Sequence, residues 1–183
     1  MTLQTKRIIA NSSLVLVLAL AVYWWRFSLA ILGGAIGIAA LAAATAYLVD
    51  QGVKWRSLVR FRAEWGTRGK DVLLVYSNSP HWQRYIEERW LSKWGSRAVV
   101  LNWSERQAWE RSQRPDAALF RAFAGQREFN PLVIVVPASG RRAHVVRFWR
   151  AFRDSKHGKD QRLRDAEADL DRYIDSGRID GEA

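Results

Sequence analysis

The stretch "VLLVYSNSPHWQR", residues 72–84, decides the fold of the charged part of this 183-residue chain. Its first six residues form an apolar run of the length and composition of a buried β-strand. Its last residues begin a segment in which large apolar side chains recur every three or four positions, the spacing of an amphipathic helix. A strand that leads through a short polar loop into a helix is typical of α/β proteins, which often bind ligands in that loop.

Further strands and helices are predicted along the rest of the chain. Ser79 before Pro80 is typical of a helix start, Ser104 with Gln107 fits a capping box, and Pro115 is expected to divide one helical segment in two. The two strand–helix–strand connections predict parallel pairing, and the turn after the third strand predicts an antiparallel hairpin. The predicted strands are residues 72–77, 97–103, 132–136 and 143–149, and the predicted helices are residues 80–94, 104–114, 116–124 and a terminal helix that ends near residue 174.

This order of elements resembles the thioredoxin-like fold (βαβαββα) over about residues 70–174. Thioredoxins carry a CGPC loop between the first strand and the first helix, and the matching residues here are Asn78, Ser79, Pro80 and His81. They also have a cis-proline before the third strand, which Pro131 after Asn130 matches. Because the chain contains no cysteine, the resemblance implies a member without redox activity. A small flavodoxin-like or Rossmann-like three-layer domain is the alternative fold.

The loop after the first strand is the candidate site for a ligand or partner. Catalysis there would use Ser77 or Ser79 as nucleophile and His81 as base, but the loop lacks the glycines of the GxSxG elbow. The free NH groups of a helix start favour binding of an anion or a peptide carboxylate, and the alternative is a plain helix cap. We assign no catalytic residue. The candidate residues are Ser77, Asn78, Ser79, His81, Asn130 and Pro131.

Residues 1–50 are predicted to form a transmembrane helical hairpin. The apolar runs 8–25 and 28–49 are each long enough, at about 1.5 Å per residue, to cross about 30 Å of hydrocarbon. Arg26, in the turn between them, is the single charged residue in residues 8–49. Lys and Arg are concentrated outside the spans, which predicts a multi-pass protein of a bacterial-type inner membrane with both termini in the cytoplasm. A cleaved signal peptide ending near Ala21 is the alternative.

The second apolar run contains a GxxxG pattern at Gly33 and Gly37. Small residues at this spacing let two helices approach closely. The pattern therefore predicts packing against the first span of the same chain or, alternatively, a homo-oligomer.

Residues 51–70 combine basic and apolar side chains at helical spacing. We expect a juxtamembrane helix whose apolar face enters the membrane interface and whose cations contact anionic lipid. The alternative is a helix that packs on the soluble domain. The predicted lipid contacts are Lys54, Arg56, Arg60 and Arg62.

The charge of the chain narrows the class of partner. The net charge is +11 and the pI about 10.7, which favours anionic partners. With no cysteine and three histidines, neither a metal centre nor a cofactor is expected. Residues 71–174 are interpreted as a cytoplasmic domain and residues 175–183 as a frayed tail. The leading hypothesis is a non-catalytic adaptor or scaffold that binds a protein or peptide at the membrane; the alternatives are an enzyme acting on an anionic or lipid-linked substrate and nucleic-acid binding.

Overall fold

The computed structural model describes residues 3–125 and 130–179, and the chain divides into two compact units, residues 1–49 and residues 50–183. The first helix, α1 (Leu3–Trp65), is continuous and replaces the predicted hairpin. The reason is local: Arg26 and Phe27, expected to form the turn, include neither Pro nor Gly, so nothing interrupts the helical hydrogen bonds there. The predicted pairing of two spans through Gly33 and Gly37 is also wrong, since nothing lies within 4 Å of a Cβ built on either glycine.

The second unit contains a four-stranded mixed sheet of order β2-β1-β3-β4. Its strands are β1 (Val72–Tyr76), β2 (Ala98–Asn102), β3 (Leu132–Val135) and β4 (His144–Arg147). β1 pairs in parallel with β2 and antiparallel with β3, and β3 pairs antiparallel with β4. All five residues of β1 are buried, as a central strand covered on both faces requires. The prediction of four strands, with a parallel first pair and a final hairpin, is therefore confirmed.

The prediction that the second crossover is parallel is wrong, because β3 runs antiparallel to β1. Two helical segments occupy this connection, α4 (Arg106–Trp109) and α5 (Pro115–Phe123). Arg147, at the end of β4 and opposite the first residue of β3, donates hydrogen bonds to the carbonyls of Phe123 and Ala124 at the end of α5. The connection therefore approaches β3 from the end of the sheet where β1 finishes, which reverses the direction of β3.

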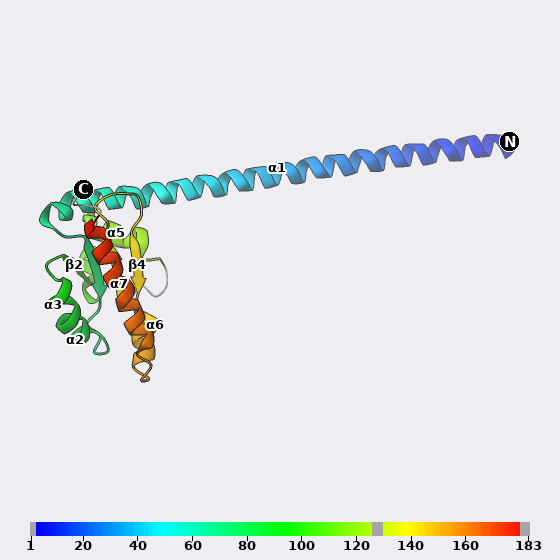
Figure 1. Ribbon diagram of the computed structural model, residues 1–183. Coiled ribbons are helices and arrows are strands. Elements are labelled where there is room, and N and C mark those ends of the chain that lie inside the picture. The colour runs from blue at the N-terminus through cyan, green and yellow to red at the C-terminus, as the bar shows by residue number, and fades with distance from the viewer. Residues whose placement is uncertain (1–2, 126–129, 180–183) are drawn as a thin grey trace. The chain divides into compact units, whose positions relative to one another are not determined.

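One face of the sheet is covered by three helical segments (Figure 1). They are the run α2 (Gln83–Tyr85), η2 (Ile86–Trp90) and α3 (Leu91–Trp94), then α6 (Trp149–Ser155), then α7 (Gln161–Ile179). Trp90 lies at the centre of this core, 2% exposed and with its ring centroid 4.4 Å from that of Phe148. This core depends on aromatic packing, which carries large buried areas.

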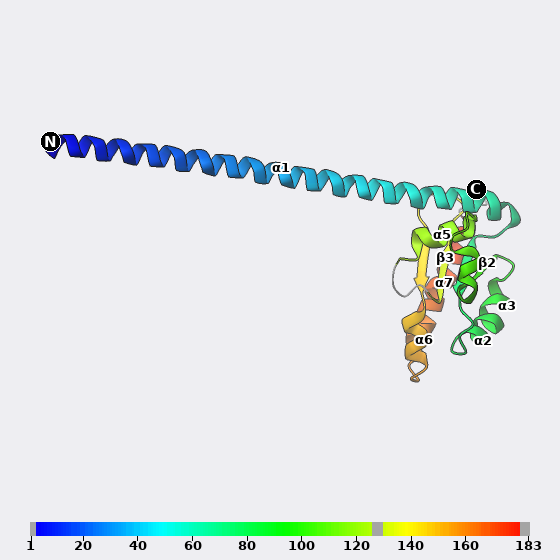
Figure 2. The ribbon, with the colours of Figure 1, turned by 180° about the vertical axis from the view of Figure 1, so that it is seen from behind.

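The opposite face is covered by the C-terminal turns of α1 together with α4 and α5 (Figure 2). Leu58 and Phe61 of α1 are fully buried in this core, and Trp65 packs against it. These residues recur at three- and four-residue spacing, so one face of the helix meets the sheet. The prediction that the apolar face of residues 51–70 enters the membrane interface is therefore wrong for Leu58 and Phe61, and the alternative of packing on the domain is correct.

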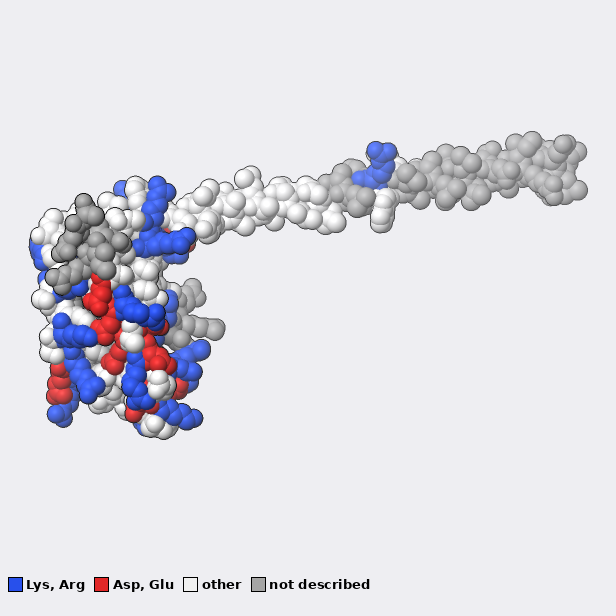
Figure 3. Space-filling model, viewed as in Figure 1, with Lys and Arg blue, Asp and Glu red and all other residues white. Residues whose placement is uncertain are grey.

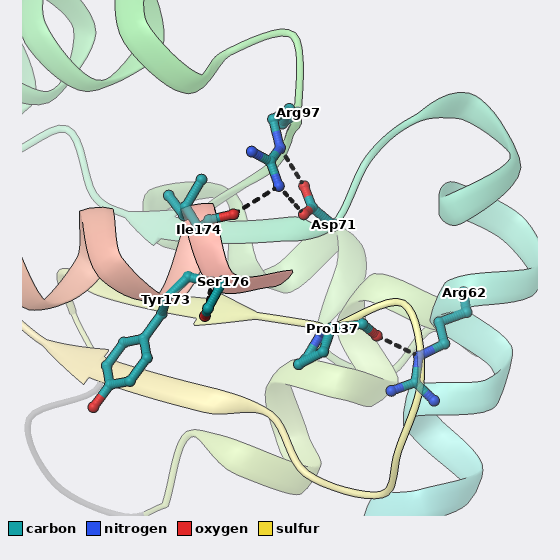
Figure 4. A network of polar contacts seen from close by, with 7 residues as sticks. All are labelled: Arg62, Asp71, Arg97, Pro137, Tyr173, Ile174 and Ser176. Atoms are coloured by element: carbon teal, nitrogen blue, oxygen red, sulfur yellow. Dashed lines mark hydrogen bonds and ion pairs between the residues drawn. The ribbon is translucent and has the colours of Figure 1, made fainter. Parts of the chain in front are cut away.

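Two arginines join distant segments of the second unit (Figure 4). Arg97 forms an ion pair with Asp71 and donates to the carbonyl of Ile174 at 3.1 Å, which ties α7 to the start of β1. Arg62 donates to the carbonyls of three residues of one loop, at 2.8, 3.0 and 2.9 Å. That loop connects β3 to β4, and the three acceptors are Pro137, Ser139 and Gly140. Partial burial lowers the pKa of Arg62.

Three element boundaries differ from the sequence prediction. The helix after β1 begins at Gln83 and not at Pro80, because the carbonyl of Ser79 accepts from Trp82 and Gln83 in a preceding turn. η3 (Trp103–Glu105) precedes α4, and Asn102 accepts from the backbone NH of Ser104, so Asn102 is the cap in place of the predicted capping box. α7 continues through residues 175–179, which the prediction assigned to a frayed tail, and residues 180–183 lie outside the described residues.

Candidate functional site

The candidate site lies at one end of the sheet, where four strand ends meet. The parallel register aligns Tyr76, the last residue of β1, with Asn102, the last of β2. The antiparallel registers pair Leu132, at the start of β3, with Val75 of β1 and with Arg147 at the end of β4. The loop after β1, the peptide before β3 and the start of α6 after β4 are therefore neighbours at this edge.

The loop after β1 is held by hydrogen bonds to the end of β2. The backbone NH of Asn78 donates to Ser104 Oγ at 3.0 Å, and Asn102 Nδ2 donates to Asn78 Oδ1 at 2.8 Å. Ser79 Oγ accepts from the backbone NH of His81 at 3.4 Å. The hydrogen bonds of Asn78 and Ser79 thus stabilise the conformation of the loop, whereas the side chain of His81 is exposed.

A pocket of about 220 Å³ opens beside this loop. Its walls are aromatic: the rings of Trp82 and Phe152 lie 6.1 Å apart, centroid to centroid, and Trp149 is 37% exposed. Its rim is cationic, and the guanidinium of Arg153 lies 5.0 Å from the Trp149 ring. The residues that line the pocket are His81, Trp82, Trp149, Phe152, Arg153 and Lys156.

Two polar features of this pocket bear on a ligand. The Nε1 of Trp82 is a buried donor without an acceptor among the described residues, and a buried donor without a partner is costly. Within the same part of the chain Lys156 has no ion pair, whereas Arg153 lies 3.5 Å from Asp154. The pocket therefore offers aromatic walls and an unpaired ammonium group, next to a tryptophan whose buried indole NH has no acceptor among the described residues.

The other two candidate residues, Asn130 and Pro131, lie at the same sheet end but do not line the pocket. The peptide bond between them is cis, as the thioredoxin resemblance implies. Pro131 is buried, and its carbonyl accepts from the backbone NH of Phe148 at 2.9 Å. Among the described residues, Asn130 Oδ1 has no hydrogen-bond partner. Of the predicted loop, the pocket thus includes His81 alone.

The sequence prediction missed most of the pocket because it assigned Trp149 to the end of a strand, residues 143–149, whereas Trp149 is the first residue of α6. Trp149, Phe152, Arg153 and Lys156 recur at the i, i+3, i+4, i+7 spacing of one helical face. α6 was not predicted as a helix separate from the terminal one, so this face was not recognised. Helical spacing within residues 149–156 is the signal that finds it.

Tyr76, the last residue of β1, belongs to the core on the face of the sheet that α6 and α7 cover. Tyr76 is 6% exposed, and its hydroxyl donates to Glu87 Oε1 at 3.3 Å. Burial, together with the nearby Glu87 carboxylate, raises the pKa of Tyr76 to about 12. Tyr76 is therefore a neutral hydrogen-bond donor across the physiological pH range.

The four predicted lipid contacts have different surroundings. Lys54 forms an ion pair with Asp50 at 2.6 Å, and Arg56 is exposed. Arg60 donates to the carbonyl of Gln113 at 2.8 Å. Arg62 donates its hydrogen bonds to the β3–β4 loop, which makes it the least suited of the four to contact lipid, although the lipid contact itself stays a prediction. Helical geometry explains this orientation, since Arg62 lies four residues after the buried Leu58, on the side of α1 that packs on the domain.

The described residues contain no group of three or more His, Asp or Glu side chains that could hold a metal ion. Among these residues, no hydrogen bond joins the ring of His81 to a carboxylate or to a serine hydroxyl. An aromatic pocket with cations at its rim is suited to an apolar side chain next to an acidic group.

The chain is thus a mixed α/β protein with one four-stranded mixed sheet and one long apolar N-terminal helix. Within the described residues, one helix is long and apolar enough to cross a membrane; its most apolar 18-residue window has a mean hydropathy of 2.1. Comparison with protein-family models gives no match, and neither the curated proteins nor the solved structures include one.

Proposed function

We propose that this protein is a membrane-anchored adaptor whose cytoplasmic domain has a thioredoxin-like fold without redox activity and binds an acidic segment of a protein partner. The observation that carries the proposal is the aromatic and cationic pocket at the sheet end, beside the loop where a thioredoxin has its cysteines. Without a thiolate, this region retains binding and no disulfide chemistry.

The strand order and pairing support the fold. A sheet of order β2-β1-β3-β4, with a parallel first pair and two antiparallel pairs, matches the thioredoxin-like arrangement. A flavodoxin-like or Rossmann-like domain would need β3 parallel to β1. The antiparallel β3 therefore argues against that alternative.

The apolar part of α1 supports the anchor. Residues 31–49 are uncharged and exposed, and as a helix they span about 28 Å, close to the thickness of a hydrocarbon core. An exposed apolar surface of that length is unfavourable in water and favourable in a bilayer. The excess of Lys and Arg after this segment orients the domain towards the cytoplasm. Anchoring then raises the effective concentration of the pocket for partners in the same membrane.

The chemistry of the pocket specifies the partner. Trp82, Trp149 and Phe152 offer contact with an apolar side chain, and Lys156 offers an unpaired cation for a carboxylate. The favoured ligand is therefore a short acidic peptide segment with one large apolar residue.

Photo-crosslinking tests this proposal in living cells. With a photoreactive aromatic amino acid at position 149 of the full chain, we expect a discrete crosslinked partner on a gel. Reversal of charge in Lys156→Glu should lower its yield about tenfold, because the rim then repels a carboxylate. Changing Asn78, Ser79 and His81 together should lower it less, since only His81 lines the pocket.

The matched control carries the same amino acid at position 100, on edge strand β2, where Val100 is 39% exposed. We expect no partner adduct from that position. Equal adducts from positions 100 and 149, or a yield that Lys156→Glu leaves unchanged, would remove the pocket from the function.

A further inference from the structure

A second cleft, of about 570 Å³, lies between the start of the domain part of α1, the end of α5 and the β3–β4 hairpin, and it shares no lining residue with the aromatic pocket. Five of its lining residues are cationic and come from four separate stretches of sequence. They are Lys54, Arg121, Arg141, Arg142 and Arg147. Asp50 is the one acidic residue among those that line it.

Two arginines of this cleft are fixed in position by hydrogen bonds and are not neutralised by a carboxylate. Arg121 donates to the carbonyls of Glu110 and Ser112, and Arg147 donates to the carbonyls of Phe123 and Ala124. Carbonyl acceptors orient a guanidinium group and leave its full charge in place.

The other two arginines are carried by the β3–β4 loop. The guanidinium of Arg141 lies 5.5 Å from the ring of Trp55, and Arg142 is exposed. Arg62 holds this loop through its three hydrogen bonds to carbonyls, so it is a positioning residue for both. Among the described residues, none of the cleft's four arginines forms an ion pair; Lys54 and Asp50 pair with each other.

The face of the domain that carries α7 has a different charge pattern. Figure 3 shows acidic and basic side chains interleaved over this face. The ion pairs there include Lys93 with Asp171 at 2.5 Å and Arg162 with Asp154 at 2.5 Å. The cleft, by contrast, brings together four arginines that form no ion pair within the described residues.

The position of the cleft along the chain indicates the anion. Its first residue, Asp50, directly follows the apolar segment that ends at Val49, and Lys54 comes about 6 Å further along the helix axis. This distance matches the depth of the head-group layer outside the hydrocarbon. Trp55, 46% exposed beside Arg141, is of the residue type that is enriched at that level.

We propose that this cleft is a binding site for the phosphate-bearing head group of an anionic phospholipid. The arginines bind the phosphate by charge-assisted hydrogen bonds, while the acyl chains stay in the bilayer beside α1. Bound lipid fixes the domain against the membrane surface. The inference rests on the proposed membrane anchor, and it is independent of the partner pocket.

Native mass spectrometry of the full chain in detergent micelles tests the site by titration with phosphatidylglycerol or phosphatidylcholine. We expect tighter binding of phosphatidylglycerol. Arg141→Gln with Arg142→Gln should raise its Kd about 30-fold, because two cations near an anionic surface are lost. Within the described residues neither side chain donates a hydrogen bond to the backbone, so the fold is expected to remain intact. Asp50→Asn should lower the Kd about threefold by removing the carboxylate from the cleft.

The charge-matched control is Lys159→Gln with Arg164→Gln, two exposed residues outside the cleft, for which we expect less than about a twofold change. Equal retention of the two lipids, or equal losses in the two double variants, would overturn the proposal. So would binding of glycerol 3-phosphate, or of a short RNA duplex, at the same site more tightly than phosphatidylglycerol. The crosslinking at position 149 is measured separately, so failure of the lipid site leaves the partner pocket intact.

Discussion

Phe61→Ala is expected to lower the free energy of unfolding of the domain by about 3–5 kcal/mol, the usual loss for a fully buried phenylalanine. Phe61 has no exposed surface and packs against the sheet beside Leu58, on the opposite side from the Trp90 core. Since whole domains are stable by about 5–15 kcal/mol, this one change in α1 removes a large part of the stability. Urea unfolding of the full chain in micelles, followed by tryptophan fluorescence, measures it.

Val53→Ala is the control for Phe61→Ala, because Val53 lies on the same helix but is 55% exposed. We expect it to change the stability by less than about 0.5 kcal/mol. If residues 51–70 instead lay in the membrane interface, Phe61→Ala would weaken membrane attachment and leave the urea midpoint of the domain unchanged. That result would show that α1 does not contribute to the core.

Trp90→Ala, in the core on the opposite face of the sheet, is expected to lower the free energy of unfolding of the domain by a similar amount, about 3–5 kcal/mol. Its ring packs 4.4 Å from Phe148 and 5.7 Å from Phe152, centroid to centroid, and its Nε1 donates to Glu167 at 2.7 Å. The residue therefore joins η2 to both α6 and α7. Trp90→Phe retains most of the ring and loses the hydrogen bond, so a smaller loss of about 1–2 kcal/mol is expected. The same urea titration measures both variants.

Trp149→Ala is expected to affect partner binding much more than the stability of the domain. Because Trp149 is 37% exposed, its removal should change the unfolding free energy by less than about 1 kcal/mol, whereas partner binding should be lost. A loss of stability as large as that of Trp90→Ala would make Trp149 a core residue and not a binding residue.

Much of the sheet is predictable from sequence because its strands are short apolar runs. Residues 72–76 and 132–135 are buried throughout and carry almost no polar side chains, so their composition alone identifies them. The direction of β3 is not predictable in the same way, because it depends on how the connection around Pro115 folds back. The start of the first domain helix was predicted incorrectly because Ser79 and Pro80 fit a helix cap, whereas the helix is capped at Trp82, three residues later.

The two binding regions were harder to predict than the fold because their residues are distant in sequence. Arg121 and Arg147 reach the same cleft from α5 and β4, and no local pattern connects them. Arg62 and Arg60 look equivalent in sequence, yet each donates to carbonyls of a different loop. Only tertiary structure distinguishes an arginine that positions a loop from one that meets a ligand.

Cysteine labelling tests the membrane anchor, on which both binding proposals depend. The chain has no cysteine, so single substitutions can be labelled without background. In cells expressing the full chain, Ser92→Cys reports on which side of the membrane the domain lies. Ile36→Cys reports whether the apolar segment is inside the membrane, and Thr5→Cys reports on which side the N-terminal end lies. Residues 8–49 would measure about 63 Å as one helix, about twice a hydrocarbon core, so labelling at position 5 shows whether the part before Arg26 crosses as well.

The result at positions 92 and 36 is the most direct measurement of the central claim that a cytoplasmic domain is anchored in a membrane. We predict that a membrane-impermeant maleimide modifies Ser92→Cys only after the cells are permeabilised, and Ile36→Cys only after the membrane is dissolved in detergent. Labelling of Ser92→Cys in intact cells, or of Ile36→Cys in permeabilised cells without detergent, would contradict it.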